Sequence, residues 1–326
     1  QTQADTPDRR RQKDHPMITF SGVIPPVVTP LLAHDQLDTP AVDRIVQHLI
    51  DGKVSGIFTL GTTGEGPSLP YRVRYEMVER TCDAAHGQVP VLVGVTDTSL
   101  AESLALAEHA RSSGAAAIVA AAPFYFDASQ QALQDWFSRL ADESPLPLML
   151  YNMPSCVGTT LSIDLVAALA DHPNVAGIKD SGGDLRYFRQ LCVEFRKPGR
   201  FSVFMGPEEL LADAVNFGAD GGVCGGANLL PLVYTDLYAA AVRSDSLEIP
   251  RLHSIIHDLF ASVYRDENGR MKLIPGLKHA MAQAGLCSPV TAPPLQPLSV
   301  EHATRIEVAF ERLATAGKLP LHASNR

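Results

Sequence analysis

The sequence predicts an α/β protein, a (β/α)8 barrel of the TIM type with a C-terminal helical extension. Three observations favour this fold. Short apolar runs recur along residues 19–245 and are nearly continuous rather than alternating, as expected of strands buried on both faces. Eight such runs alternate with eight longer amphipathic segments. The eight pairs occupy about 225 residues, which fits the usual size of this barrel.

Each pair begins with a short apolar strand, and the expected strands are residues 22–31, 56–61, 89–95, 115–123, 146–153, 175–181, 201–206 and 221–227. Each strand precedes a helix with one apolar face, at residues 38–53, 70–86, 99–113, 129–143, 162–171, 185–197, 208–217 and 232–244. Three helices end at Gly52, Gly114 and Gly218, where we expect a left-handed residue. The chain then enters the next strand at once, as in a parallel sheet with crossover helices.

Residues 246–319 contain three further helical segments, at 250–264, 269–284 and 299–316, with a proline-rich hinge at 288–297. No low-complexity linker precedes them. We therefore expect one unit in which residues 19–245 form the barrel and residues 246–319 a helical extension packed on it. Residues 1–18 are expected to be a disordered tail and residues 320–326 a second tail. A doubly wound sheet is the alternative, but no G-x-G-x-x-G motif follows the first strand.

Composition limits the partners and the compartment. Lys and Arg number 27 against 36 Asp and Glu, giving a net charge of -9, which argues against the basic surface that nucleic acids select. No apolar run approaches the roughly 18 residues of a membrane span, so we expect neither nucleic acid nor a membrane as a partner. Five cysteines without C-x-x-C spacing indicate a reduced, cytoplasmic protein. The arginines at 9–11 suggest a twin-arginine export signal as an alternative, but no apolar segment follows them.

Lys179 ends an apolar predicted strand instead of lying on a helix face. In this architecture the catalytic groups lie at the C-terminal ends of strands. A buried ammonium is costly unless it is paired or deprotonated. A lysine whose pKa falls toward about 7–8 becomes a nucleophile that can form a Schiff base with a keto acid. The alternatives are a lysine that extends into solvent or one that pairs with Asp180.

The second predicted strand ends in the turn Gly-Thr-Thr-Gly-Glu-Gly at residues 61–66. Its glycines, beginning with Gly61, let backbone N–H groups approach a ligand, and Thr62 and Thr63 add two hydroxyls. The spacing fits neither common phosphate motif, and Glu65 would repel a dianion. We therefore expect this turn to bind a carboxylate; the alternative is an ordinary turn between a strand and a helix.

Tyr151 ends the fifth predicted strand, one strand before Lys179 in the barrel. Its phenol is therefore expected to face the same cavity and to transfer a proton there. The alternative is a packing role with one hydrogen-bonded hydroxyl.

Other candidate nucleophiles and metal ligands are weaker. Cys156 and Cys224 fall near strand ends, and both are expected to be small buried thiols. His253 and His257 lie four residues apart but have no acidic partner at ligand spacing. We expect neither a metal nor an organic cofactor.

Three motifs stand in order at the ends of predicted strands: Gly-Thr-Thr-Gly-Glu at 61–65, Tyr-Asn-Met-Pro at 151–154 and Gly-Ile-Lys-Asp at 177–180. Together they resemble the motifs of the dihydrodipicolinate synthase / N-acetylneuraminate lyase family, over residues 20–319. The resemblance implies a (β/α)8 barrel with a C-terminal helical extension, assembled as a homotetramer. It also implies a Schiff-base lyase or aldolase that works on pyruvate.

The resemblance assigns roles to individual residues. Lys179 would form the imine with pyruvate or another 2-oxo acid, Thr62 and Thr63 would hold its carboxylate, and Tyr151 would be the acid/base beside it. Tyr125 matches a tyrosine that family members pass across a dimer interface to complete a Thr–Tyr–Tyr proton relay. Two further positions match the lining of the same pocket, Gly206 and the carbonyl of Val223.

One position departs from the family pattern. In the lysine-biosynthetic synthases an arginine follows the Tyr-Asn-x-Pro-Ser run and pairs with the carboxylate of the second substrate, whereas this chain has Cys156. A neutral thiol cannot make that bidentate contact. We therefore expect reversible cleavage of a 2-oxo acid, of the 2-keto-3-deoxy sugar acid kind, to pyruvate and an aldehyde. The alternatives are dihydrodipicolinate synthesis from pyruvate and aspartate semialdehyde, N-acetylneuraminate cleavage, and a non-catalytic barrel that binds a small acid.

Overall fold

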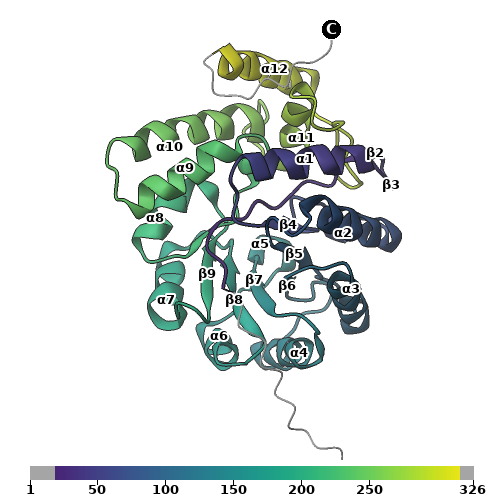
Figure 1. Ribbon diagram of the computed structural model, residues 1–326, viewed down its shortest axis with the longest axis vertical. Helices are drawn as coiled ribbons and strands as arrows, with labels where there is room; N and C mark the ends of the chain where they lie inside the picture. Colours follow the sequence, from purple (N-terminus) through teal and green to yellow (C-terminus); the bar gives the residue numbers. More distant parts are fainter. Residues whose placement is uncertain (1–18, 316–326) are drawn as a thin grey trace, which may run out of the picture.

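The computed structural model describes residues 19–315, and its centre is a ring of eight parallel strands. They pair in the order β1-β10-β9-β8-β7-β6-β5-β4, and helices surround them (Figure 1). Their bounds are β1 Gly22–Val23, β4 Ile57–Thr59, β5 Val91–Gly94, β6 Ala117–Ala121, β7 Leu148–Asn152, β8 Val175–Asp180, β9 Ser202–Met205 and β10 Gly221–Gly222. Each lies within a predicted range, so the predicted barrel is confirmed.

The ring closes between β4 and the segment after β1. Pro26 pairs with Phe58 across this junction, the Val27 N–H donates to the Phe58 carbonyl, and the Phe58 N–H donates to the Pro25 carbonyl. The predicted first strand, residues 22–31, is too long. β1 ends at Val23 because the two prolines lack the N–H groups that a regular ladder needs.

Two further differences concern the strands. A small antiparallel hairpin, β2 Leu31–Ala33 and β3 Gln36–Leu37, follows the closing segment and was not predicted. The eighth predicted strand, residues 221–227, is also too long, since Gly225–Asn228 form a 3-10 turn. In that turn the Asn228 side chain donates to the Pro26 carbonyl and accepts from the Val28 N–H, both at 3.0 Å. The turn after the last strand therefore braces the closure of the ring.

The helices of the barrel agree with the predicted ones to within a few residues. They are α1 Thr39–Asp51, α2 Tyr71–Ala85, α3 Leu100–Ser112, α4 Gln130–Glu143, α6 Ile163–Ala170, α7 Leu185–Phe195, α8 Leu211–Asn216 and α9 Pro231–Val242. Five of them follow a residue whose side chain accepts a first-turn N–H, namely Asp38, Ser99, Ser129, Ser162 and Asp184. α8 is shorter than predicted because Glu208–Leu210 form a 3-10 turn. The four-residue helix α5, Pro154–Val157, was not predicted.

Gly52 does not have the expected left-handed conformation, although Gly114 and Gly218 do. Its φ is -76°, and the left-handed residue is the next one, Lys53, with φ of 61°. Gly52 is needed for its size instead, because a Cβ there would lie 2.3 Å from the Pro231 side chain. The glycine thus permits close packing between the end of α1 and the start of α9.

The C-terminal helices are α10 Glu248–Leu259, α11 Leu273–Gln283 and α12 Val300–Thr315, with a π-helical turn at Phe260–Tyr264. They lie on one side of the barrel, where α10 packs on α9 and α11 on α12 (Figure 1). α11 begins later than predicted because Arg265 and Met271 pair in a β-bridge, and the chain turns between them. The expected tails, residues 1–18 and 320–326, lie outside the described residues.

The core has two parts. One fills the interior of the strand ring and includes Phe58, Tyr151, Phe204 and Val223. The other lies between the strands and the helices. Side chains of a strand alternate between these two environments. The residue at which a strand ends therefore decides which side chains lie at the mouth of the ring.

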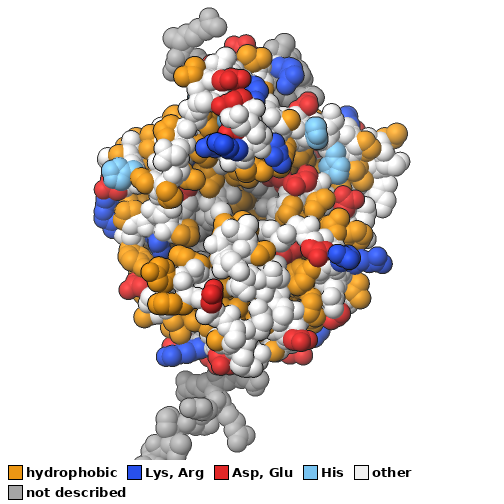
Figure 2. Space-filling view, turned by 180° about the vertical axis from the view of Figure 1, so that it is seen from behind, with side chains coloured by type: hydrophobic (Ala, Val, Ile, Leu, Met, Phe, Trp, Pro, Cys, Tyr) orange, Lys and Arg blue, Asp and Glu red, His pale blue; other side chains and the backbone are white. Residues whose placement is uncertain are grey.

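The outer surface is mixed in character. On the face opposite that of Figure 1, Lys and Arg side chains are scattered among acidic and apolar ones (Figure 2). Within residues 19–315, no helix is both long enough and apolar enough to cross a membrane.

Candidate active site

Lys179 and Tyr151 lie side by side inside the strand ring. Tyr151 of β7 is in register with Lys179 of β8. The Lys179 nitrogen lies 4.1 Å from the centroid of the Tyr151 ring and 5.3 Å from that of the Phe58 ring, and the residue is only 4% exposed. The alternative in which Lys179 extends into solvent is therefore wrong. Its amine rests against two aromatic rings.

Asp180 is the next residue, and side-chain alternation turns it away from the interior of the ring. Its Oδ1 accepts from Asn152 Nδ2 at 2.7 Å and from the Gly182 N–H at 3.0 Å, and burial raises the pKa of this carboxyl. Asn152 also accepts from the Leu161 N–H at 3.0 Å. Asp180 therefore braces the ends of β7 and β8 and does not form the ion pair with Lys179 that was the other alternative.

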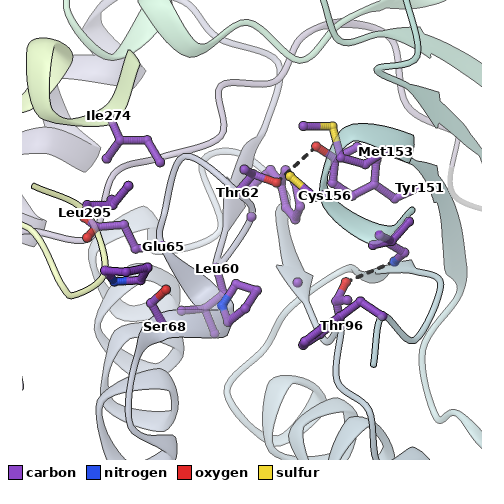
Figure 3. A pocket seen from close by; sticks show the side chains of 18 residues that line it. Leu60, Thr62, Glu65, Ser68, Thr96, Tyr151, Met153, Cys156, Ile274 and Leu295 are labelled. Carbon is purple, nitrogen blue, oxygen red and sulfur yellow. Dashed lines mark hydrogen bonds between the residues drawn. The ribbon is translucent and has the colours of Figure 1, made fainter. Parts of the chain in front are cut away.

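The hydroxyls of Tyr151 and Thr62 are 3.3 Å apart, and either can donate (Figure 3). Thr62 belongs to the turn after β4, so this hydrogen bond joins two of the three sequence motifs. Both side chains line one cavity. The hydroxyl of Tyr151 thus has a partner that can pass a proton to it or take one from it.

The turn after β4 has an unusual backbone. Leu60 and Glu65 both adopt left-handed conformations, with φ of 57° and 59°, which are uncommon for residues other than glycine and often occur at functional sites. A Cβ on Gly61 would lie 2.6 Å from the Phe58 ring. The turn therefore requires glycine at position 61 and lies directly against a ring that contacts Lys179.

Glu65 is paired rather than free. Its Oε1 lies 2.5 Å from the Lys278 nitrogen of α11, and neither side chain is exposed. Its Oε2 accepts from the Ala292 N–H at 2.6 Å, and Lys278 donates to the Val290 carbonyl at 2.7 Å. Burial lowers the pKa of Lys278, an effect that the Glu65 carboxylate opposes. Glu65 is therefore not the free negative charge that its place in the sequence suggested.

A cavity of about 430 Å³ opens beside these residues. Figure 3 shows Thr62, Tyr151, Met153 and Cys156 on one side of it, and two residues of the C-terminal extension, Ile274 and Leu295, on the other. The extension thus supplies part of the wall. Sequence reasoning missed these two residues because they belong to no motif.

The two cysteines near strand ends differ. Cys224 is buried as expected, and burial raises the pKa of its thiol well above the usual value. Cys156 is exposed and lines the cavity, so the prediction of a buried thiol there is wrong. The short helix α5 turns this position toward the cavity mouth, and periodicity did not reveal a helix of four residues.

Three predicted binding residues, Thr63, Gly206 and Val223, are not among the residues that line this cavity. Val223 is inside the strand ring, and the Gly206 N–H donates to the Asp180 carbonyl at 2.7 Å at the end of β9. Thr63 is buried, and its hydroxyl lies 3.7 Å from the place where a Cβ on Gly225 would stand. Of the two threonines, Thr62 is the one that lines the cavity.

Tyr125 is not brought to the other site residues within one chain. It is 78% exposed and packs edge-on against Phe126, with ring centroids 5.0 Å apart. Phe126 is 81% exposed as well. These rings extend from the loop after β6 into open space.

A further buried carboxylate, Glu208, lies under the turn after β10. It accepts from the Gly226 N–H at 2.7 Å and from the hydroxyls of Tyr234 and Tyr264 at 2.6 and 2.9 Å. Burial raises the pKa of Glu208. It therefore fixes the backbone next to Thr63 and Val223. Nothing local in the sequence distinguished it from a solvated acid at the start of a helix.

Comparison with known proteins is consistent with this site. Residues 19–313 match the model of the dihydrodipicolinate synthetase family. "Probable 2-dehydro-3-deoxy-D-pentonate aldolase YjhH" of Escherichia coli K12 is 33% identical over 311 residues, covering 94% of this chain and 100% of that protein.

Two solved structures share the fold. A dihydrodipicolinate synthase from Bacteroides thetaiotaomicron has a TM-score of 0.86 and 40% identity, covering 90% of this chain and 99% of its own. YagE of E. coli K12, solved in complex with pyruvate, has a TM-score of 0.83 and 30% identity with the same coverage.

The matched family is the one that the three motifs resemble. Its members named above include an aldolase and a synthase, so the predicted reaction class, a Schiff-base lyase or aldolase, is confirmed. The chain belongs to the dihydrodipicolinate synthetase family.

Proposed function

We propose that Lys179 forms a Schiff base with C2 of pyruvate, or of a 2-oxo acid that the enzyme cleaves to pyruvate and an aldehyde. The observation that carries this proposal is the pairing of Lys179 with Tyr151 inside the strand ring, with Thr62 hydrogen-bonded to that tyrosine. An amine that faces aromatic rings and no carboxylate is available to attack a carbonyl carbon.

The neighbouring groups would bind the substrate carboxylate and transfer protons. The hydroxyls of Thr62 and Thr63 and the backbone at Gly61 would hold the carboxylate of the 2-oxo acid, as fixed donors that need no reorganisation. Tyr151 would be the acid/base, and Thr62 its proton partner. Tyr125 of a second copy would complete the relay, and the same pocket would be lined by Gly206 and the Val223 carbonyl.

The steps balance without a metal or an organic cofactor. The Lys179 nitrogen adds to C2 and water leaves, giving a protonated imine. The C3–C4 bond breaks, its electron pair moves toward the imine to form an enamine, and the C4 hydroxyl gives its proton to Tyr151 as C4 leaves as an aldehyde. The enamine takes a proton at C3, and water then hydrolyses the imine to release pyruvate.

The aldehyde half of the substrate is uncharged in this proposal. Cys156 lines the cavity at the position where the synthases have an arginine, so a carboxylate on the second substrate has no partner there. A 2-oxo acid of the 2-keto-3-deoxy type is therefore favoured over aspartate semialdehyde and over N-acetylneuraminate. YjhH, whose name assigns it a 2-dehydro-3-deoxy acid, supports this choice.

We also propose a homotetramer in the cytoplasm. The exposed rings of Tyr125 and Phe126 suit a contact with a second copy, and the five cysteines are all free, as in a reducing compartment. Light scattering tests the assembly.

Borohydride trapping tests the function. Reduction in the presence of pyruvate is expected to add a stable mass to the peptide that contains Lys179, and Lys179→Ala is expected to lose the adduct and all turnover while keeping its circular dichroism spectrum. Wild-type protein that remains unmodified would remove the mechanism. Rapid consumption of aspartate semialdehyde, measured with a coupled reductase, would instead support dihydrodipicolinate synthesis.

A further inference from the structure

The wall of the cavity beside Thr62 and Tyr151 is mostly apolar. Its side-chain hydroxyls are those of Tyr151 and Thr62, of Thr96, whose Oγ1 already accepts from the Ala121 N–H at 3.0 Å, and of Ser68 on the side of Leu295 (Figure 3). Most of the remaining wall is formed by side chains with little or no hydrogen-bonding capacity, among them Phe124, Met153, Cys156, Val157, Ile274 and Leu295.

The lining of this cavity carries no positively charged side chain. Its 18 lining residues include no lysine, arginine or histidine. The single lining carboxylate, Glu65, is held by Lys278 and by the Ala292 N–H. An anionic tail would thus lose its hydration and gain no counter-ion, which is costly in an apolar site.

We propose that the aldehyde half of the substrate carries an apolar tail, bound between Met153, Cys156 and Val157 on one side and Ile274 and Leu295 on the other. The inference rests on the proposed function and makes it more specific. The 2-oxo acid end lies at the hydroxyls of Tyr151 and Thr62, and the carbon chain extends between these five side chains. Hydroxyl groups on that part of the chain would face methyl, methylene, thioether and thiol groups and exchange hydrogen bonds to water for weak ones or none.

This inference differs from the sequence-based expectation of a sugar acid. That expectation followed from the missing arginine, which excludes a charged partner but does not distinguish a hydroxylated aldehyde from an apolar one. The distinction comes from Ile274 and Leu295, which reach the cavity from the C-terminal extension.

The experiment measures addition of pyruvate to a matched aldehyde series with the full-length wild-type enzyme. Propanal, butanal and pentanal are compared with 3-hydroxybutanal and with succinic semialdehyde, whose carboxylate replaces the end of the pentanal chain. We expect kcat/KM to rise about fourfold per added methylene. We expect butanal to exceed 3-hydroxybutanal, and pentanal to exceed succinic semialdehyde at least about tenfold, since the carboxylate loses hydration against this wall and gains no charged partner. Equal or reversed preferences would overturn the inference.

Two variants of matched size test the wall itself. Cys156→Arg is expected to raise the ratio of succinic semialdehyde to pentanal at least about tenfold, because it supplies a charged partner, whereas Cys156→Met is expected to keep the wild-type preference. No change of the ratio in Cys156→Arg would contradict the assignment of this wall to the aldehyde.

Borohydride trapping with pyruvate is measured on each protein. Absence of the Lys179 adduct from the wild type would refute the proposed function, whereas a normal adduct with a preference for hydroxylated or charged aldehydes would refute only the apolar tail.

Discussion

The ammonium nitrogen of Lys278 lies 2.5 Å from Oε1 of Glu65, although the two residues are 213 positions apart in the chain and neither side chain reaches solvent. Glu65 belongs to the turn that carries Thr62 and Thr63, and Lys278 belongs to α11. The C-terminal extension therefore holds the turn that is proposed to bind the carboxylate, in addition to lining the cavity.

Lys278→Met is expected to lower the free energy of unfolding by about 3–5 kcal/mol, because it leaves the Glu65 carboxylate buried without its cation. The double variant Glu65→Gln/Lys278→Met should recover most of this loss, since both charges are then gone. Urea denaturation of the wild type, the two single variants and the double variant measures the coupling. A double variant no more stable than Lys278→Met would show that the carboxylate is not held mainly by this charge.

Tyr151→Phe is expected to lower kcat by about 10²–10⁴-fold, the usual contribution of a positioned acid/base group. The ring that lies against Lys179 is kept, so borohydride trapping with pyruvate should still modify the lysine. Thr62→Val removes the partner of the phenol and one proposed donor to the carboxylate, so it should raise KM as well as lower kcat. A Tyr151→Phe enzyme with wild-type turnover would require another proton carrier.

Tyr125→Ala is expected to abolish most activity while changing the stability of the single chain by less than about 0.5 kcal/mol, because the ring is 78% exposed. If Tyr125 acts across a subunit contact, mixing Tyr125→Ala with Lys179→Ala subunits after partial unfolding should restore activity. The mixed assembly contains sites with both an intact lysine and an intact relay. Activity that stays at the level of the separate variants would place Tyr125 outside the relay.

His302 of α12 makes stability depend on pH. Its Nε2 donates to the Val263 carbonyl at 3.0 Å, and Nδ1 has no hydrogen-bond partner among the described residues. Burial, and then the nearby Arg305, lower its pKa from the usual 6.5. Because the folded-state pKa lies below the unfolded one, this contribution is fully present above about pH 6.5 and is lost as the pH falls through the folded-state value.

His302→Gln keeps a side-chain donor but does not titrate. The difference in unfolding free energy between the wild type and this variant should therefore be constant above about pH 7 and shrink in favour of the variant toward pH 5. Urea denaturation at matched pH values measures it. A difference independent of pH would show that His302 keeps its usual pKa in the fold.

Much of the barrel could be predicted because it depends on local patterns. Buried parallel strands are apolar throughout, and their carboxyl ends meet at one end of the ring. This is why Lys179 and Tyr151, 28 positions apart, could be expected to lie together. The same reasoning predicted that Thr62 lies near them, because the turn after β4 is at the same end of the ring.

The parts of the site that were not predicted depend on contacts between distant segments, which periodicity does not encode. Lys278 has the sequence context of an ordinary helix residue, and only the packing of α11 brings it to Glu65. Similarly, Tyr234 and Tyr264 meet at Glu208 because a π-helical turn directs Tyr264 inward. The wrong expectations have local causes: two prolines ended β1, and a packing contact with Pro231 accounted for Gly52.

The junction at Pro26 and Phe58 is a seam of the cylinder that has few backbone hydrogen bonds. Two prolines leave few amides to hold it, and β4, on its far side, continues directly into the glycine-threonine turn. Thermal breathing of the barrel should therefore begin at this seam, with the amides of Val27 and Phe58 exchanging with deuterium before those of β7 and β8. The strands that carry the lysine and the tyrosine would then stay rigid while the seam opens.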